Sequence, residues 1–191
     1  MLRDDKNQKK LIVKQKVIGK QNNSKMCFVC GMSNNLGLKA SFYEMENDEL
    51  VAIFTPKNIH QSYPGRLHGG IASTILDETI GRAILMKDEN IWGVTLELNV
   101  KFKKPVPYDE ELKVICKITN ETSRMFEGVG RIVLPNGDIA VTAEGKYFKM
   151  PIEKITNIEF TADQWFKLKT DNDPKEIDLS LIHISEPTRP Y

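Results

Sequence analysis

The chain has 191 residues, with 27 Lys or Arg against 26 Asp or Glu, so its formal net charge is only +1. This balance excludes the strong field that would favour nucleic acid or an anionic membrane as the main partner. Hydrophobic residues make up 40% of the chain and charged residues 28%, which is typical of a globular protein with room for one domain and its extensions.

The cysteines and the first residues bear on the compartment. Three cysteines, Cys27, Cys30 and Cys116, are too few and odd in number for a disulfide framework. Charged residues interrupt the apolar runs of the first 20 residues, so no signal peptide or membrane span is expected there. We therefore expect a cytoplasmic protein whose residues 1–24 form a polar, weakly ordered or loosely docked extension.

The next elements expected along the chain are a hairpin and one long helix. Residues 38–45 and 49–55 predict two strands around a polar turn. From residue 70 to residue 84, apolar side chains recur every three or four positions, which predicts a helix with a broad buried face.

Four further strands are expected after the helix, over residues 92–102, 111–119, 125–134 and 139–150. The segment Pro135-Asn136-Gly137-Asp138 is a hairpin turn signal between the last two. A hairpin, a helix and a run of antiparallel strands predict an α+β fold in which the sheet wraps one central helix.

Two segments follow the predicted domain, an accessory extension at residues 151–178 and a tail at residues 179–191. Residues 151–178 are polar with three aromatic side chains, and predict a short helix packed on the edge of the domain. Leu179–Arg189 reads LSLIHISEPTR, which resembles the translation of the transposase adapter used for DNA sequencing libraries. We therefore expect residues 179–191 to be non-native and leave His183 out of any site.

The stretch GRLHGGIASTILDETIG carries the strongest chemical signal. Gly69 and Gly70 open the predicted helix, where free backbone amides can hold a developing oxyanion. Asp77 follows seven residues after Gly70, which places its carboxylate on the same helix face two turns along. Together they outline a hydrolytic site.

Each residue of this motif also has a structural interpretation. Glycines permit a tight entry turn, and an acid on a helix is often part of its solvated face. His68 could orient the loop or transfer a proton. Glu78 points about 100° around the helix from Asp77 and is expected to be a structural or salt-bridging residue.

The same stretch resembles the hotdog-fold acyl-CoA thioesterases of the phenylacetate-pathway and THEM type. Cys27-Phe-Val-Cys-Gly31 with Asn35-Leu-Gly-Leu38 resembles a CxxCG...NPxGL signature of one branch, and Gly93-Val-Thr-Leu-Glu-Leu-Asn-Val-Lys-Phe resembles the strand after the helix. The resemblance extends over residues 26–150 and implies a hotdog domain at residues 25–150. It also implies a homodimer or homotetramer whose active sites lie at the subunit interface.

Residue roles follow from the resemblance. It implies that the Gly70 amide polarises the thioester carbonyl, that Asp77 acts as general base or nucleophile, and that Thr95 of a partner subunit places the water, with His68 assisting. The position of an Asn found in many relatives is Ser62 here, with Gln61 as a possible substitute. The remaining residues expected to bind substrate are Gly69, Lys103, Lys104, Arg124 and Lys146, the last four as contacts of the CoA phosphates.

No metal or other cofactor is expected. Cys27 and Cys30 would form half of a zinc site, yet no second Cys or His pair follows at ligand spacing, and no thioredoxin-like βαβ context supports a redox pair. We take these cysteines as packing or loop residues.

The expected function is hydrolysis of an acyl-CoA to a free acid and CoA, as part of lipid metabolism. A non-catalytic acyl-CoA binding or sensing module is the alternative, because one fold hosts several functions. A thioester dehydratase is disfavoured, because no His follows Asp77 until the suspect tail.

Overall fold

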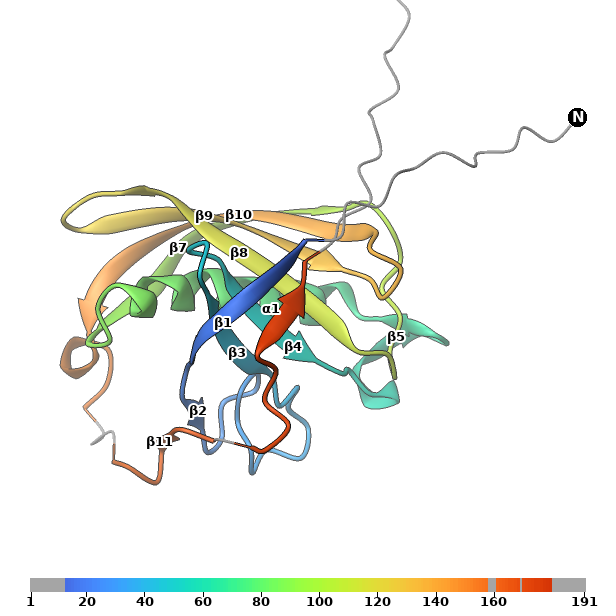
Figure 1. The fold of residues 1–191 in the computed structure, drawn as a ribbon, viewed down its shortest axis with the longest axis horizontal. Helices are drawn as coiled ribbons and strands as arrows, with labels where there is room; N and C mark the ends of the chain where they lie inside the picture. Colours follow the sequence, from blue (N-terminus) through green and yellow to red (C-terminus); the bar gives the residue numbers. More distant parts are fainter. Residues whose placement is uncertain (1–12, 158–160, 169, 180–191) are drawn as a thin grey trace, which may run out of the picture.

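A computed structural model describes residues 13–157, 161–168 and 170–179 of the chain. In these residues one helix lies against a curved sheet of eight antiparallel strands (Figure 1). The helix is α1 (Gly69–Arg82), and the strand order is β12-β1-β3-β4-β8-β9-β10-β7. The strands are β1 (Lys14–Lys20), β3 (Ser41–Met45), β4 (Leu50–Phe54), β7 (Ile91–Phe102), β8 (Leu112–Glu121), β9 (Met125–Val133), β10 (Ile139–Pro151) and β12 (Glu176–Asp178).

The predicted α+β class is confirmed, as are the hairpin, the long helix and the four strands after it. Two short strand pairs lie outside the large sheet: β2 (Asn23–Ser24) pairs with β11 (Trp165–Phe166), and β5 (Gln61–Tyr63) pairs with β6 (Arg66–Leu67). Three short 3-10 helices complete the described elements: η1 (Asn58–His60), η2 (Ala83–Met86) and η3 (Ile152–Lys154).

The core lies between α1 and the concave face of the sheet. Ile75, Leu76 and Ile80 of α1 are fully buried there, and burying each such side chain stabilises the fold by about 1.5–3 kcal/mol. Gly128 and Gly130 of β9 let the helix approach closely: a Cβ on Gly128 would lie 2.7 Å from Ile80 Cγ2. These contacts fix the position of α1, and with it the candidate site residues that the helix carries.

The expectation of a loosely docked extension over residues 1–24 is wrong for residues 14–20. These residues form β1, which pairs with β3 on one side and β12 on the other. Lys14 and Lys16 are exposed while Val17 packs on a second apolar cluster, on the sheet face opposite α1. Because of the lysines, the sequence does not show a clear alternation of apolar and polar side chains, which is the pattern that predicts a strand. Residues 1–12 lie outside the described residues.

Among the described residues of the segment 151–178, the only helix is the three-residue 3-10 helix η3. The segment also contains two strands that the sequence analysis did not predict, β11 and β12, and Ile177 of β12 is buried in the second cluster. These strands were missed because their apolar side chains are too few to form a regular pattern.

Leu179, placed by the sequence in the non-native tail, is 5% exposed, and its amide donates to the Val13 carbonyl at 2.9 Å. Residues 180–191 lie outside the described part of the chain, so the non-native origin of the tail stays a prediction. Among the described residues, no helix has the length and apolar character needed to cross a membrane.

Candidate functional site

His68 caps the N-terminus of α1. Its backbone is extended, with φ −65° and ψ 134°, and its Nδ1 accepts a hydrogen bond from the Gly70 amide at 2.9 Å. The amide predicted to polarise a carbonyl is therefore engaged by the imidazole. A substrate oxygen would have to replace that nitrogen to reach the amide.

A hollow of about 460 Å³ lies beside the start of α1, between the β5–β6 hairpin and the end of β7. It brings together four predicted residues from three segments: Ser62, Gly69, Lys103 and Lys104. Gln61 lies next to Ser62 in β5, paired with Leu67. The hollow is thus a candidate substrate site at the helix start.

Three residues of this hollow were missed by the sequence analysis. Tyr63 and Phe102 are exposed at 73% and 57%, and Arg66 adds a third cationic side chain to the two lysines. A Cβ on Gly69 would lie 3.4 Å from Phe102 Cε1, so the glycine leaves room beside this ring. Such large exposed apolar side chains beside cations fit a ligand with an apolar part and an anionic part.

Lys104 already has an anionic partner. Its Nζ lies 2.7 Å from Asp138 Oδ2, and this hydrogen bond lowers the pKa of the Asp138 carboxyl. A phosphate at Lys104 would compete with that carboxylate.

Asp77 lies two turns further along α1, in a second group of polar residues. Its Oδ1 accepts hydrogen bonds from Thr95 Oγ1 of β7 at 2.9 Å and from Tyr147 Oη of β10 at 3.1 Å. Burial and the neighbouring Asp77 charge raise the pKa of Tyr147 far above its usual range, so the phenol remains a donor. The carboxylate is half-buried and fixed by two hydroxyl groups.

Thr95 contacts Asp77 of its own chain, whereas the resemblance implied a threonine from the partner subunit. The expectation that Thr95 of a partner subunit places the water stays a prediction. Thr95 reaches Asp77 because β7, which directly follows η2, runs back beside the helix that carries the carboxylate.

A β-bulge in β7 turns Thr95 toward α1. Lys146 pairs with Glu97, but the next residue, Tyr147, pairs with Thr95, so Leu96 is an extra residue in the ladder. Side chains alternate between the two sheet faces, and without this bulge Thr95 would face the same way as Glu97. The bulge places Thr95 and Tyr147 side by side on Asp77.

Tyr147 was missed because its role depends on strand register, which no local sequence pattern reveals. Its ring also fills the space beside Gly81 of α1, where a Cβ would lie 3.2 Å from Tyr147 Cε1. The ring stacks on Phe126 with 5.0 Å between centroids. The space beside Gly81 is therefore occupied by a side chain that holds the carboxylate.

Gly70 and Asp77 of one chain do not meet. Seven residues of α-helix span about 10.5 Å along the axis. A single carbonyl group cannot contact an amide and a carboxylate so far apart. The described residues form two half-sites, one at the start of α1 and one around Asp77.

Three other predicted residues lie apart from both half-sites. Glu78 accepts a hydrogen bond from Arg82 Nε at 2.8 Å, which confirms its salt-bridging role. Lys146 lines a groove over β9 and β10 and lies 3.2 Å from Glu127 Oε1, and Arg124 lies in the turn between β8 and β9. The structure does not bring Arg124 or Lys146 to the hollow that contains Lys103 and Lys104.

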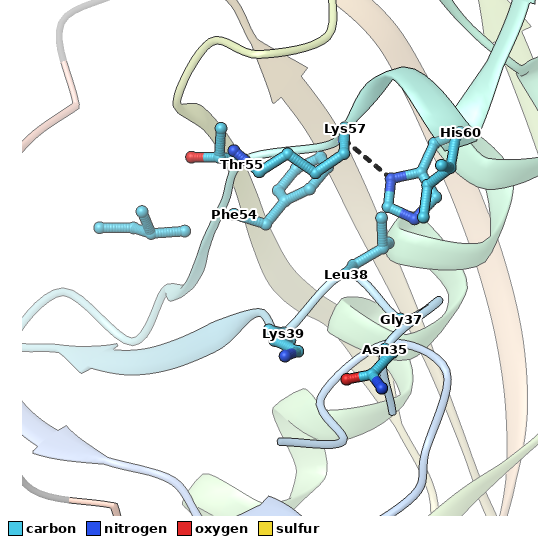
Figure 2. A pocket seen from close by; sticks show the side chains of 10 residues that line it. Asn35, Gly37, Leu38, Lys39, Phe54, Thr55, Lys57 and His60 are labelled. Carbon is cyan, nitrogen blue, oxygen red and sulfur yellow. Dashed lines mark hydrogen bonds between the residues drawn. The ribbon is translucent and has the colours of Figure 1, made fainter. Parts of the chain in front are cut away.

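Figure 2 shows a second hollow, of about 400 Å³, lined by the Asn35–Leu38 loop, the end of β4 and η1. The buried His60 links these segments: its Nδ1 accepts from the Lys57 amide at 2.9 Å, and its Nε2 lies 2.9 Å from the Leu36 carbonyl. The His60 carbonyl in turn accepts from the His68 amide at 2.9 Å. The Asn35–Leu38 loop therefore supports the residue that caps α1.

Known proteins resemble this chain in sequence. Residues 64–140, from the β5–β6 turn to the start of β10, match the family model of the thioesterase superfamily. The resemblance to the thioesterase superfamily is confirmed. The chain is 32% identical to the mouse acyl-coenzyme A thioesterase THEM4 over 102 residues, which are 53% of this chain and 41% of the mouse protein. The chain thus spans less than half the length of that relative.

Solved structures show the same fold. A phenylacetic acid degradation-related protein of Ralstonia eutropha superposes with a TM-score of 0.54 at 17% identity, covering 58% of this chain and 85% of that one. A hypothetical thioesterase protein of Streptococcus pneumoniae with coenzyme A superposes with a TM-score of 0.50 at 20% identity, covering 54% and 82%. The chain therefore has the hotdog fold predicted from its sequence.

Proposed function

We propose that this protein is an acyl-CoA thioesterase that hydrolyses an acyl-CoA to a carboxylic acid and CoA. The observation that carries the proposal is the Asp77 carboxylate, held by Thr95 and Tyr147 on the helix whose N-terminus is His68-Gly69-Gly70. A carboxylate fixed by hydroxyl groups and exposed amides at a helix start are the two parts that acyl transfer to water requires. The likeness to the acyl-coenzyme A thioesterase THEM4 supports the substrate class.

A complete site requires two chains in this proposal. Because Gly70 and Asp77 are about 10.5 Å apart along one helix, two antiparallel α1 helices related by a two-fold axis would bring Gly70 of one near Asp77 of the other. β7 lies at one edge of the sheet among the described strands, and Leu96 on it is 55% exposed. Proteins cover or pair the edge of such a long strand, and the described strands pair with β7 on one side only, so a homodimer through β7 fits both observations.

In the proposed reaction the Gly70 amide donates to the thioester oxygen after His68 Nδ1 has given up that amide. Asp77 then acts in one of two ways. As a general base it takes a proton from water, whose oxygen attacks the carbonyl carbon. As a nucleophile it attacks that carbon itself, and water then hydrolyses the anhydride. In both routes the carbon–sulfur bond breaks, and the CoA thiolate leaves and takes up a proton.

The hollow at the start of α1 is the proposed substrate site. Tyr63 and Phe102 would contact the acyl chain or the pantetheine arm, and Lys103, Lys104 and Arg66 would bind the CoA phosphates. Neither route uses a metal or another cofactor. The coenzyme A of the Streptococcus pneumoniae relative supports a CoA ligand on this fold.

One observation favours a second function, a non-catalytic acyl-CoA binding module. The Gly70 amide is occupied by His68 Nδ1, and a site in which that contact persists would bind the thioester without polarising its carbonyl. This module would bind acyl-CoA with no turnover.

The test is hydrolysis of a panel of acyl-CoA substrates of different chain length, with the released thiol measured by a chromogenic reagent. We expect turnover by the wild type, and a loss of at least about 10²-fold in kcat for Asp77→Ala, because the reaction loses its base or nucleophile. Asp88→Asn is the matched control on an exposed carboxylate near the end of the same helical segment and should keep full activity. Calorimetric binding without turnover would replace the enzyme by the binding module.

A further inference from the structure

The CxxC motif that the sequence analysis took as a packing element forms a closed cluster with α1. The Gly31 amide donates to the Cys27 carbonyl at 2.8 Å, which closes the loop and turns both cysteines the same way. The sulfur atoms of Cys27 and Cys30 and the carboxylate of Glu78 all lie within 4.8 Å of one another. Cys27 is half-buried and Cys30 is 1% exposed.

Arg82 is the fourth member of this cluster. Its Nη2 lies 3.0 Å from Cys30 Sγ and its Nε lies 2.8 Å from Glu78 Oε1. The guanidinium stacks between two aromatic rings, 4.2 Å from the centre of Phe42 and 4.7 Å from that of Trp165. The side chain is 4% exposed, so this positive charge is fixed against the sulfur.

The fixed charge argues against a metal site. A cation bound by both sulfurs and Glu78 would lie beside the positively charged guanidinium, which already contacts Cys30 and Glu78 and lies over the rings of Phe42 and Trp165. Within the described part of the chain, no further His, Cys, Asp or Glu joins the group to complete a tetrahedral site. The cluster is therefore built around a thiolate and an arginine.

The surroundings make the two cysteines unequal. A hydrogen bond from Cys27 and the Arg82 charge outweigh burial and lower the pKa of Cys30 to about 6. The same pairing with Cys30, together with burial, raises the pKa of Cys27. The surroundings therefore favour the thiolate form of Cys30 and the thiol form of Cys27, which is the pairing found in reactive dithiols.

We propose that Cys27 and Cys30 form a site of reversible oxidation, in which hydrogen peroxide converts them to an intramolecular disulfide. The Cys30 thiolate attacks one peroxide oxygen: an S–O bond forms, the O–O bond breaks, and hydroxide leaves. Cys27 then attacks Cys30 Sγ: the S–S bond forms, the S–O bond breaks, and the departing hydroxide takes the Cys27 proton as water. Both sulfurs are oxidised by one electron, and the peroxide is reduced by two.

The position of the site gives the oxidation a structural consequence. The disulfide removes the anionic sulfur that faces Arg82, and Glu78 alone is left to balance this buried charge. Since reduction restores the thiolate contact, the reduced state is the stabilised one, and a dithiol should reverse the reaction.

The experiment treats the fully reduced, full-length protein with hydrogen peroxide, blocks free thiols under denaturing conditions and maps the peptides by mass spectrometry. We expect a peptide with a Cys27–Cys30 disulfide, which disappears after treatment with dithiothreitol. Cys116 is 0% exposed and is not part of a CxxC motif, so its thiol should remain unoxidised and be alkylated, which makes it an internal control. Cys27→Ser should stop at a sulfenic acid on Cys30, trapped by dimedone. Cys30→Ser should leave Cys27 as a thiol, and Cys116→Ser should leave the disulfide unchanged.

Three outcomes would overturn the proposal. The linked peptide could be missing from a protein whose circular dichroism spectrum is unchanged, or the oxidised product could be a disulfide between two chains on a non-reducing gel. In the third outcome, the protein purified with zinc chloride contains one zinc ion per chain. Both cysteines would then be protected from peroxide in the wild type, and this protection would be lost in Cys27→Ser. That result would replace the oxidation site by a metal site.

Discussion

At the residue scale, the two hydroxyl groups on Asp77 set the direction of its carboxylate. Thr95 and Tyr147 both donate to Oδ1, and among the described residues no donor contacts Oδ2. A carboxylate anchored through one oxygen presents the other to a reactant at no further cost of side-chain ordering. The positioning role of Thr95 and Tyr147 is separable from their packing role, and it can be tested by removing one hydroxyl group.

Tyr147→Phe removes one hydroxyl group from Asp77 and keeps the ring that stacks on Phe126. A hydrogen bond to a charged group contributes about 1.5–3 kcal/mol, so we expect kcat for acyl-CoA hydrolysis to fall by about 10- to 100-fold with little change in KM. Steady-state kinetics and thermal unfolding check this result. Tyr43→Phe, which removes a hydroxyl group on the opposite sheet face, is the control and should leave kcat unchanged. An unchanged kcat in Tyr147→Phe would show that the Tyr147 hydroxyl group does not position Asp77 for the reaction.

The sequence predicted Asp77 and the start of α1 but not Tyr147, for a physical reason. Seven-residue spacing on a helix is local, and it fixes the face on which Asp77 lies. The contact of Tyr147 with Asp77 joins residues 70 positions apart and depends on one bulge between β7 and β10. A shift of one residue turns a side chain to the other face of a sheet, and nothing in the sequence near Tyr147 specifies that shift.

At the element scale, α1 and strands β8 to β10 follow from periodicity, whereas β1 and β12 do not. The helix and β8 to β10 bury apolar side chains in the core, and such buried faces produce a regular sequence pattern. β1 and β12 bury only a few side chains each on the second cluster, among them Val17 and Ile177. β1 and β12 form because they pair with neighbouring strands, so their own sequences lack a strand pattern and look like those of polar extensions.

The contact between α1 and β9 should be sensitive to a single added methyl group. A Cβ on Gly130 would lie 3.0 Å from Ile80 Cδ1 and 3.2 Å from Leu76 Cδ2. We expect Gly130→Ala to lower the free energy of unfolding by about 1–3 kcal/mol through overpacking. Urea denaturation measures this change.

The double variant tests the cause of that loss. Ile80→Val removes Cδ1, so Gly130→Ala with Ile80→Val should lose less stability than the sum of the two single changes. Ile84→Val is the control, one turn further along, and should be additive with Gly130→Ala. Additive losses in both pairs would show that the cost of Gly130→Ala does not arise at Ile80.

At the scale of the whole molecule, the segment before β12 is held to the sheet by Asp173. Asp173 Oδ1 lies 2.6 Å from Lys20 Nζ of β1 and 3.1 Å from Tyr43 Oη of β3. Burial opposes ionisation of this carboxyl, but the hydrogen bonds from Lys20 and Thr170 lower its pKa to about 2. The charged form of Asp173 therefore stabilises the contact of this segment with β1 and β3.

The pH dependence of stability should report this contact. The folded pKa of Asp173 lies below its unfolded value near 3.8, so its contribution is fully present above about pH 5 and is lost as pH falls toward 2. We expect Asp173→Asn to lower the free energy of unfolding by about 1–2 kcal/mol at pH 7, and the difference from wild type to shrink between pH 4 and pH 2. Urea denaturation across this range measures it. A constant difference at every pH would assign the loss to packing rather than to charge.

The proposed sharing of the active site between chains can be tested by mixing two inactive variants. Asp77→Ala removes the carboxylate, and Gly70→Pro removes the polarising amide at a first-turn position where proline is tolerated. Each variant alone should be inactive, while Gly70→Ala, which keeps the amide, separates the loss of the donor from the added bulk.

Co-expression with two affinity tags isolates the dimer that contains one chain of each variant. If Gly70 of one chain works with Asp77 of its partner, this mixed dimer holds one intact site and one doubly altered site, and its kcat should be about half that of the wild type. If both residues act within one chain, each site of the mixed dimer carries one altered residue, so the mixed dimer stays inactive. In that case the helix of one chain would have to bring together two groups that are about 10.5 Å apart along its axis.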